Sequence, residues 1–269
     1  MQSSSWVTGL CAGLMSLCLI ACHNADQPNT LVVGTISGPE TELMDVAQKV
    51  ASDRYGLSIK IVEFNDYNLP NMALQDGTLD ANVYQHLPYL ETAINSQHYA
   101  FEVIGKTFLY PTGIYSAHFK HLKDLPYGAV VAIPNDPSNE TRAWLLLQQS
   151  GLISLRHGVN PGRMINSKDI YRNPKNLKFK AMDAAQLPRI LPDVDAAIIN
   201  TTFAIPAGLN PTTDAIYIEN KQSPYANLIV IRQNSNKRTL LNTFVKSLNS
   251  DEVKEKAQQL FGKSALPAW

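Results

Sequence analysis

Residues 31–62 read LVVGTISGPETELMDVAQKVASDRYGLSIKIV, and this stretch decides the fold. The apolar run at 31–36 is typical of a buried strand, and residues 57–62 alternate between apolar and polar as a second strand does. Between them, Pro39 suits the first turn of a helix and Gly56 its C-terminal end. Apolar residues recur there at helical spacing, at Leu43, Val46, Ala47, Val50 and Ala51. A strand, a helix and a strand in so short a stretch predict a βαβ unit, and therefore a parallel sheet.

Strands and helices continue to alternate on both sides of a break at Tyr110-Pro111-Thr112-Gly113, which we interpret as a crossover. Before the break, the pattern predicts helices at 69–74 and 88–96 and strands at 80–83 and 101–109. After it, the pattern predicts strands at 114–119, 129–133, 177–181, 196–199, 215–218 and 228–231. Helices are expected from Asp136 to Ser150, at 240–248 and at 253–261, and residues 151–176 are expected to be irregular. Ser223-Pro224 marks the expected return crossover.

Two α/β units joined by two crossovers predict a two-lobed molecule. Residues 31–110 together with 224–269 form the first expected lobe, and residues 111–223 form the second. Each lobe is expected to hold a mixed, mainly parallel sheet flanked by helices, with the two crossovers as a hinge. One continuous doubly wound sheet is the alternative. Because ligands of open α/β sheets bind outside the carboxyl ends of the strands, we expect the binding site in the cleft between the lobes.

The composition is that of an ordinary globular protein. The chain has 269 residues, of which 45% are apolar, so there is ample material for a hydrophobic core. Its 23 basic and 23 acidic residues cancel, and this balance argues against a nucleic-acid partner, which normally requires a basic excess. The mixed composition also excludes collagen-like and low-complexity chains.

The first 21 residues differ from the rest because they contain no charged side chain. Their apolar run at 7–20 is shorter than the ~20 residues of a membrane span, and it fits the apolar region of a signal peptide. The run ends in Leu19-Ile20-Ala21-Cys22, which resembles the lipobox of bacterial lipoproteins, whose cysteine is acylated, for example with palmitate. We therefore expect a signal peptide at 1–21 and a lipidated Cys22 that opens a polar tether at 22–30. A plain signal peptide and an N-terminal anchor helix are the alternatives.

Lipidation would place the protein in the cell envelope, anchored to a membrane and facing the periplasm. The inner and the outer membrane both stay open, because His23 is not the acidic residue that signals retention at the inner membrane. Cys11 and Cys18 lie in the expected leader, so the chain after Cys22 has no disulfide and no thiolate for a metal or for nucleophilic catalysis. There is also no Gly-rich phosphate loop and no G-x-S-x-G motif, so we expect no enzyme, no metal and no cofactor.

Residues 135–142 read NDPSNETR and contain the most informative binding motif. Asp136 can cap a helix whose first position is Pro137, and the free N–H groups of such a helix terminus attract anions. Arg142 follows about one turn later and can add a bidentate contact to a carboxylate. The motif therefore predicts a site for a small carboxylate ligand, and a capped surface helix with a solvated arginine is the alternative.

Two further groups lie where strands meet helices or loops, at places that face a cleft. One group combines aromatic faces that can enclose an apolar side chain such as a thioether, and comprises Tyr67, Tyr84, His86 and Tyr89. The other consists of Asn200, after an expected strand, and Asn227, before one. Two amides can recognise an α-ammonium and a carboxylate together. Packing between the lobes and turn formation are the alternatives for the two groups.

Several strings of the chain, taken together, resemble the NlpA-type lipoproteins from the lipobox to the C-terminus. The strings are FNDY at 64–67, QHLPYL at 85–90, NDP at 135–137, NPKNL at 173–177, INTT at 199–202 and SPYANLIV at 223–230. The resemblance implies a periplasmic-binding-protein fold of the type II-like form. It also implies a substrate-binding lipoprotein that captures methionine in the interlobe cleft and delivers it to the permease of an ABC importer.

The resemblance also implies roles for individual residues. Arg142 would hold the ligand carboxylate with Asn139 beside it, and Asn200 and Asn227 would bind the amino-acid head group. The thioether pocket would be lined by Tyr67, Tyr84, His86 and Tyr89, where Tyr84 replaces a frequent Phe of the family. The expected protein is a monomer whose partners are L- or D-methionine, a permease with its ATPase subunit, and a membrane. Another apolar amino acid, a methionine-containing dipeptide and an adhesion role at the cell surface are the alternatives.

Overall fold

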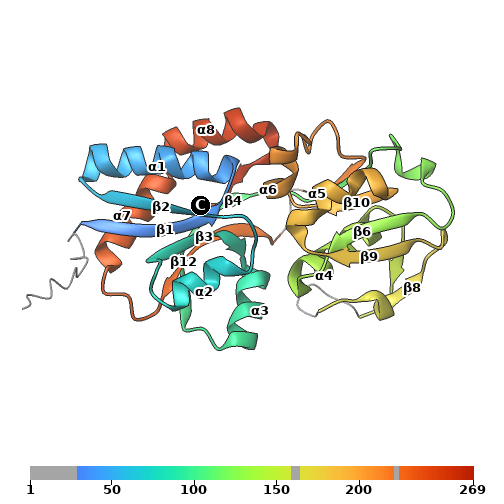
Figure 1. Cartoon of the computed structure of the whole chain (residues 1–269), viewed down its shortest axis with the longest axis horizontal. Helices are drawn as coiled ribbons and strands as arrows, with labels where there is room; N and C mark the ends of the chain where they lie inside the picture. The colour runs from blue at the N-terminus through green and yellow to red at the C-terminus, as the bar shows by residue number, and fades with distance from the viewer. Residues whose placement is uncertain (1–28, 159–163, 221–223) are drawn as a thin grey trace, which may run out of the picture.

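The computed structural model describes residues 29–158, 164–220 and 224–269, and it divides them between two large sheets that lie side by side (Figure 1). The first sheet has six strands in the order β13-β4-β12-β3-β1-β2, and the second has five in the order β11-β5-β10-β6-β9. A single continuous sheet, the alternative considered from the sequence, is therefore wrong. The expected leader at 1–21, Cys22 and Ser223 of the return crossover lie outside the described residues.

The first sheet is built from both ends of the chain. Its strands are β1 (Thr30–Ile36), β2 (Ser58–Phe64), β3 (Ala81–His86), β4 (Phe101–Leu109), β12 (Ala226–Arg232) and β13 (Leu266–Pro267). Strand β1 runs parallel to β2 and β3, whereas β12 runs antiparallel to β3 and β4. The sheet is therefore mixed, as expected, but it is not mainly parallel, because β13 also runs antiparallel to β4. Its parallel part consists of the βαβ unit predicted from residues 31–62 together with β3.

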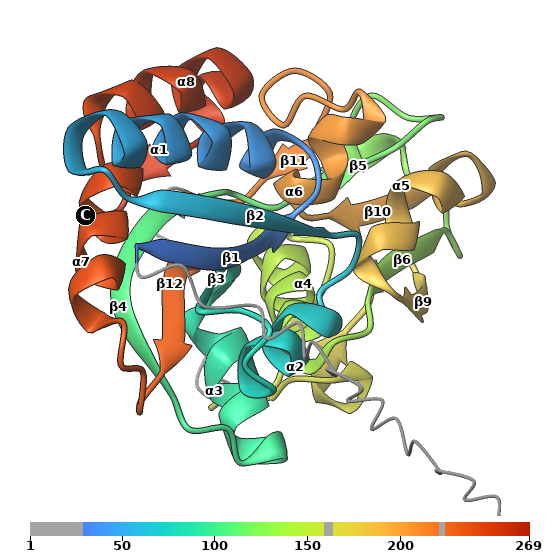
Figure 2. The same cartoon turned by 60° about the vertical axis from the view of Figure 1, so that its left-hand side comes forward.

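Helices cover both faces of the first sheet (Figure 2). One face carries α1 (Pro39–Tyr55), α7 (Arg238–Leu248) and α8 (Asp251–Phe261), which bury Leu43, Phe244 and Val253 in one apolar cluster. The other face carries α2 (Leu69–Gln75) and α3 (Leu87–Gln97), whose Leu74 and Leu90 pack in a second cluster. A strand backed on both faces needs apolar side chains on both sides, which explains the continuous apolar run at 31–36.

The second sheet comes from the middle of the chain. Its strands are β5 (Gly113–Tyr115), β6 (Val130–Pro134), β9 (Lys178–Met182), β10 (Ala196–Ile199) and β11 (Tyr217–Ile218). Strand β6 is parallel to β9 and β10, and β5 is antiparallel to β10 and β11. Helix α4 (Pro137–Gln149) packs Trp144 and Leu147 against one face. The other face is covered by α5 (Leu187–Ile190) and α6 (Thr201–Ala204).

The remaining elements are short. Strand β7 (Ser154–Leu155) pairs antiparallel with β8 (Ile170–Arg172) within the stretch that we expected to be irregular. The 3₁₀ helices are η1 (Leu122–Asp124), η2 (Ser167–Asp169), η3 (Ala184–Gln186), η4 (Leu191–Asp193), η5 (Ile205–Ala207) and η6 (Gly262–Ser264).

Some boundaries differ from the prediction for local reasons. The strand expected at 114–119 ends at Tyr115, because the Ser116 hydroxyl accepts hydrogen bonds from the N–H groups of His118 and Phe119 and closes a turn. The strand expected at 215–218 is reduced to Tyr217–Ile218. By contrast, α1 begins at Pro39 and ends against Gly56 in the left-handed region at φ 61°, as its end signals predict.

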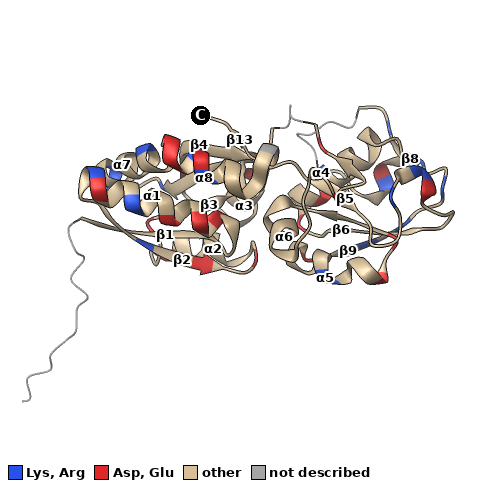
Figure 3. Ribbon diagram, turned by 90° about the horizontal axis from the view of Figure 1, so that it is seen from above, with Lys and Arg blue, Asp and Glu red and all other residues tan. Residues whose placement is uncertain are grey.

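Charge is distributed evenly over the molecule. In the ribbon of Figure 3, acidic and basic residues occur on both halves, and neither sign is confined to one of them. Within residues 29–158, 164–220 and 224–269, no helix is long and apolar enough to cross a membrane. The two halves are joined by the crossover at Tyr110–Thr112 between β4 and β5, and by the return segment between β11 and β12.

Candidate binding site between the two sheets

A narrow cavity lies where the two halves meet, and all eight residues that the sequence suggested for ligand binding line it. Four come from the first sheet and its connections on the amino-terminal side of the crossover: Tyr67, Tyr84, His86 and Tyr89. Three come from the second half, namely Asn139, Arg142 and Asn200. Asn227, expected just before a strand, is the second residue of the return strand β12. The cavity is also lined by four residues that were not singled out, Gln85, Tyr110, Thr201 and Thr202.

The start of α4 places Asn139 and Arg142 in the cavity wall. Asp136 caps the helix, and its Oδ1 accepts a hydrogen bond from the Asn139 N–H at 2.9 Å. The Asn139 amide also donates to the same carboxylate at 3.0 Å. Burial raises the pKa of Asp136, while these hydrogen bonds act in the opposite direction. The expected N-terminal cap is therefore confirmed, and Arg142 lies one turn further along the same helix.

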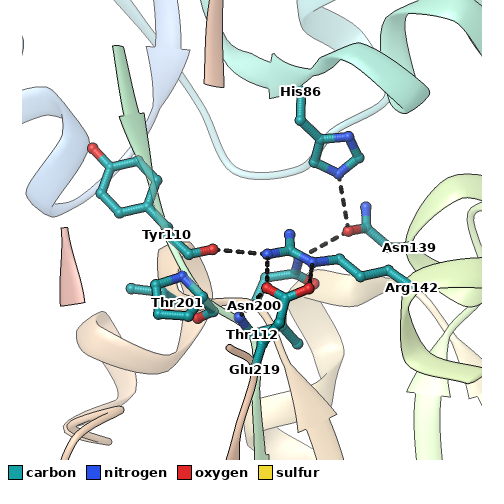
Figure 4. A network of polar contacts seen from close by, with 9 residues as sticks. His86, Tyr110, Thr112, Asn139, Arg142, Asn200, Thr201 and Glu219 are labelled. Carbon is teal, nitrogen blue, oxygen red and sulfur yellow. Dashed lines mark hydrogen bonds and ion pairs between the residues drawn. The ribbon is translucent and has the colours of Figure 1, made fainter. Parts of the chain in front are cut away.

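The guanidinium of Arg142 is held by a residue that the sequence did not suggest (Figure 4). Nε donates to Glu219 Oε1 at 3.0 Å and Nη2 donates to Glu219 Oε2, so the two side chains form a bidentate ion pair. Nη2 also donates to the Tyr110 carbonyl at 2.9 Å, and the ring of Tyr225 lies 4.3 Å from the guanidinium carbon. The bidentate contact expected for a ligand carboxylate is thus made to Glu219, and Nη1 remains without a partner among the described residues.

Amide and imidazole groups link the two halves beside this pair. Asn139 Oδ1 accepts from Asn200 Nδ2 at 2.9 Å and lies 3.3 Å from His86 Nε2. His86 caps α3, and its Nδ1 accepts from the N–H of Tyr89, so the proton of the neutral ring belongs on Nε2. Burial and the positive charge of Arg142 lower the pKa of His86 to about 3, which keeps the ring neutral.

The other end of the cavity is aromatic. The rings of Tyr67, Tyr84 and Tyr89 lie with their centroids 5.7–6.0 Å apart, and Phe203 packs on Tyr67 at 4.8 Å. The Tyr89 hydroxyl donates to the Tyr67 carbonyl at 2.7 Å, which fixes the ring. Such a wall of aromatic faces and edges suits an apolar or thioether side chain.

A buried carboxyl group supports Asn227 from behind. Glu40 Oε1 accepts from Asn227 Nδ2 at 3.2 Å and from the Thr202 hydroxyl at 3.3 Å. Because Glu40 is only 6% exposed, desolvation raises the pKa of its carboxyl to about 8, and the two hydrogen bonds only partly oppose this. Its sequence position, in the first turn of α1, is typical of a solvated residue that interacts with the helix dipole, so the sequence carried no signal for its burial.

The described residues, 29–158, 164–220 and 224–269, contain no group of three His, Cys, Asp or Glu side chains that could hold a metal ion. What the cavity offers is a set of hydrogen-bond donors and acceptors at one end and aromatic surface at the other. The carbonyl oxygen of Asn200 is buried without a partner in the described part of the chain, so it is available to a donor on a ligand.

Known proteins share this sequence and architecture. Residues 31–269 match the family model described as NlpA lipoprotein. The D-methionine-binding lipoprotein MetQ of Salmonella typhimurium is 47% identical over 257 residues, which cover 94% of this chain and 94% of that protein.

Two solved structures are similarly close. A nutrient binding protein from Burkholderia cenocepacia bound to methionine is 49% identical with a TM-score of 0.87, covering 89% of this chain and 100% of that one. A periplasmic substrate-binding protein of an ABC transporter from Coxiella burnetii is 49% identical with a TM-score of 0.85, covering 88% of this chain and 100% of that one. These similarities confirm the expected periplasmic-binding-protein fold.

Proposed function

This chain belongs to the NlpA lipoprotein family, and from that premise we propose that it captures methionine between its lobes and delivers it to an ABC importer. The observation that carries the proposal is that one cavity between the halves is lined by both polar and aromatic side chains. Methionine has the matching division, with a zwitterionic head group and a thioether side chain. The relatives named for methionine binding, and the methionine-bound neighbour, support the same ligand.

We assign the polar end to the head group. Arg142 offers Nη1 to the ligand carboxylate, with Asn139 beside it, while the free carbonyl of Asn200 and the amide of Asn227 serve the α-ammonium. Burying a methionine side chain is worth only about 1.5–3 kcal/mol, so tight binding requires these preorganised polar groups as well.

The aromatic end receives the side chain. Tyr67, Tyr84, His86 and Tyr89 enclose it, and the sulfur packs against ring edges. The hydroxyl of Tyr84 is buried without a hydrogen-bond partner in the described part of the chain, so a polar group of a ligand can satisfy it.

The two halves act as lobes, with residues 31–110 and 224–269 in the first and 111–223 in the second. The hydrogen bonds from His86 to Asn139 and from Thr202 to Glu40 join the lobes on either side of the cavity. Ligand binding favours the closed arrangement only by its higher affinity for that state, and the closed form is the one that a permease recognises. We assign the protein no catalytic step.

Cys22 attaches the monomeric protein to an envelope membrane by its lipid, with the tether at 22–30 leading to the first strand. In this position the binding lobes face the periplasm, where they reach the permease and its ATPase subunit. The membrane that carries the anchor, inner or outer, is a separate question that fractionation of the native cells answers.

Calorimetry on the full-length lipidated chain tests the proposal. The protein is purified in detergent, unfolded and refolded to remove carried-over ligand, and titrated with L-methionine, D-methionine, leucine, glutamine and glycyl-methionine. We expect saturable methionine binding, weakened about 10–100-fold in Arg142→Ala and in Asn227→Ala. The exposed residues Arg189 and Asn95 provide matched controls, because their replacement by Ala is expected to leave binding unchanged.

The outcomes separate the candidate ligands. A folded protein that binds neither methionine isomer contradicts the proposal. Binding of leucine or of glycyl-methionine in their place identifies the alternative ligand within the same fold.

A further inference from the structure

We propose that Glu219 determines the charge selectivity of the cavity: by neutralising Arg142, it makes the site a receptor for a zwitterion and not for an anion. This inference rests on the proposed function, because it concerns the same cavity. Glu219 belongs to neither of the residue groups that the sequence suggested, and its role follows from its position in the structure.

The ion pair of Arg142 and Glu219 is buried, and further hydrogen bonds hold each of its two side chains in place. The side chains of Arg142 and Glu219 are 4% and 10% exposed, so solvent does little to screen them. The Thr112 N–H donates to Glu219 Oε2 at 3.3 Å, and the Glu219 N–H donates to the Thr112 carbonyl at 2.9 Å. Glu219 is therefore attached to the crossover by its backbone as well as by its side chain. These two hydrogen bonds fix its position beside Arg142.

Few other charges face the guanidinium. Burial keeps His86 neutral by lowering its pKa to about 3, and it raises the pKa of Glu40 to about 8, so that carboxyl is largely protonated at pH 7. The carboxylate of Asp136 faces the N-terminus of α4 and accepts hydrogen bonds from Asn139 and Ser138. Arg142 is thus the one charged side chain among the described residues that line the cavity, and its charge is cancelled by Glu219, which pairs with it from outside that lining.

This cancellation has a direct consequence for ligands. A zwitterion adds no net charge to a neutral cavity, whereas an anion adds one negative charge that nothing in the cavity balances. Without Glu219, Arg142 would favour an anion, because its positive charge would be unpaired and its Nε and Nη2 donors would be free to bind a carboxylate. Figure 4 shows the arrangement that prevents it, with Glu219 on the Nε and Nη2 side of the guanidinium and the remaining nitrogen turned toward the side of His86 and Asn139.

The test compares ligands that differ only in charge. L-Methionine is a zwitterion, and 4-(methylthio)butanoate is the corresponding anion without the amino group. Calorimetry on the full-length chain measures the ratio of their affinities in the wild type, in Glu219→Gln and in Glu219→Asp. The Gln variant keeps the shape and loses the charge, whereas the Asp variant keeps the charge on a shorter side chain.

We expect a wild-type preference for methionine that falls at least tenfold in Glu219→Gln and is largely retained in Glu219→Asp. A ratio that is unchanged in a folded Glu219→Gln protein overturns the inference, and so does an equal change in both variants. Thermal melting followed by circular dichroism establishes that each variant is folded.

The same ratio is measured for leucine and 4-methylpentanoate, so that the inference is tested separately from the identity of the ligand. If leucine binds and methionine does not, the proposed ligand is wrong. The preference for a zwitterion over an anion is then still tested, by the ratio of the affinities for leucine and 4-methylpentanoate. If the wild type binds neither zwitterion, both the proposed function and this inference fail.

Discussion

The side-chain amide of Asn227 donates to the carboxyl of Glu40 at 3.2 Å, which joins the start of β12 to the first turn of α1. Because its Nδ2 is engaged in this way, the role proposed for Asn227 uses its side-chain carbonyl oxygen. Thr202, from the other half of the molecule, donates to the same Glu40 oxygen at 3.3 Å. One buried carboxyl group therefore supports a cavity residue and connects the two halves.

The free energy of unfolding is expected to depend on pH through Glu40. Its carboxyl has a pKa of about 8 in the folded protein against a reference value of 4.5, so between these pH values the unfolded chain releases a proton that the folded chain keeps. Stability due to this group is therefore present at low pH and is lost as pH rises from about 4.5 to 8. Glu40→Gln cannot ionise and should be more stable than the wild type at pH 8, by about 1–3 kcal/mol, with no such gain at pH 4.

Urea denaturation at the two pH values measures this difference. Glu255→Gln, a change at an exposed position of α8, is the matched control. A stability difference between Glu40→Gln and the wild type that is the same at both pH values would contradict the burial of an uncharged carboxyl.

The Arg142–Glu219 pair predicts strong coupling between two substitutions. Arg142→Met should lower the free energy of unfolding by about 3–5 kcal/mol, because it leaves the Glu219 carboxylate buried without its partner. The double variant Arg142→Met with Glu219→Met should recover at least half of this loss, since an apolar pair of similar volume can replace a buried ion pair. Denaturant titrations of the two single variants and the double variant give the coupling energy, and strictly additive effects would refute the pairing.

His86 predicts the opposite response to acid. The pKa of its ring falls from 6.5 to about 3 on folding, so below pH 6.5 the unfolded chain takes up a proton that the folded chain refuses. Stability from this group is present above about pH 6.5 and is lost as pH falls toward 3. His86→Asn keeps a side chain suited to the cap of α3 and removes the titration.

We expect His86→Asn to gain about 1–3 kcal/mol of stability relative to the wild type on going from pH 7 to pH 4. Urea denaturation at both pH values measures the gain, and His98→Asn, at an exposed histidine after α3, is the control. The idea of a buried neutral ring fails if the relative stability of His86→Asn does not change with pH.

The lipid anchor is tested in the cell. Cys22→Ser should move the protein from the membrane fraction to the soluble envelope fraction, because the acylated side chain is lost. Labelling with radioactive palmitate should disappear with the same substitution. Cys18→Ser, inside the expected leader, is the control that should keep both the label and the membrane location. Membrane association that persists in Cys22→Ser would favour an uncleaved N-terminal anchor helix.

The sequence predicted the fold well where the signal was local. Pro39 and Gly56 delimit α1 as expected, and Asp136 and Pro137 begin α4, because caps and helical periodicity act over a few residues. The short β13 at Leu266–Pro267 was missed, since two residues carry no periodicity and the strand exists only through its pairing with β4.

The sequence predicted which residues would lie together, but it did not reveal the acidic residues that pair with them. All eight suggested residues line the cavity, and three of them, Tyr67, His86 and Asn200, lie at junctions between a strand and a helix. Glu219 lies 77 residues after Arg142, and Glu40 lies 187 residues before Asn227. Nothing in the composition around either acidic residue distinguishes it from a solvated one. Only the three-dimensional arrangement shows that both are buried and paired with cavity residues.

The position of β12 between β3 and β4 has a consequence for the order of folding. Residues 113–218 supply every strand of the second sheet, so that sheet can form from one continuous stretch of nascent chain. The first sheet stays open at its centre until the last part of the chain arrives, although its first strands are synthesised earliest. During this interval β3 exposes an unpaired edge and β4 has no partner strand, because both of its neighbours, β12 and β13, come later in the chain. Unpaired strands of this kind are templates for aggregation. Protection by chaperones is therefore needed most by the half of the molecule that begins the chain.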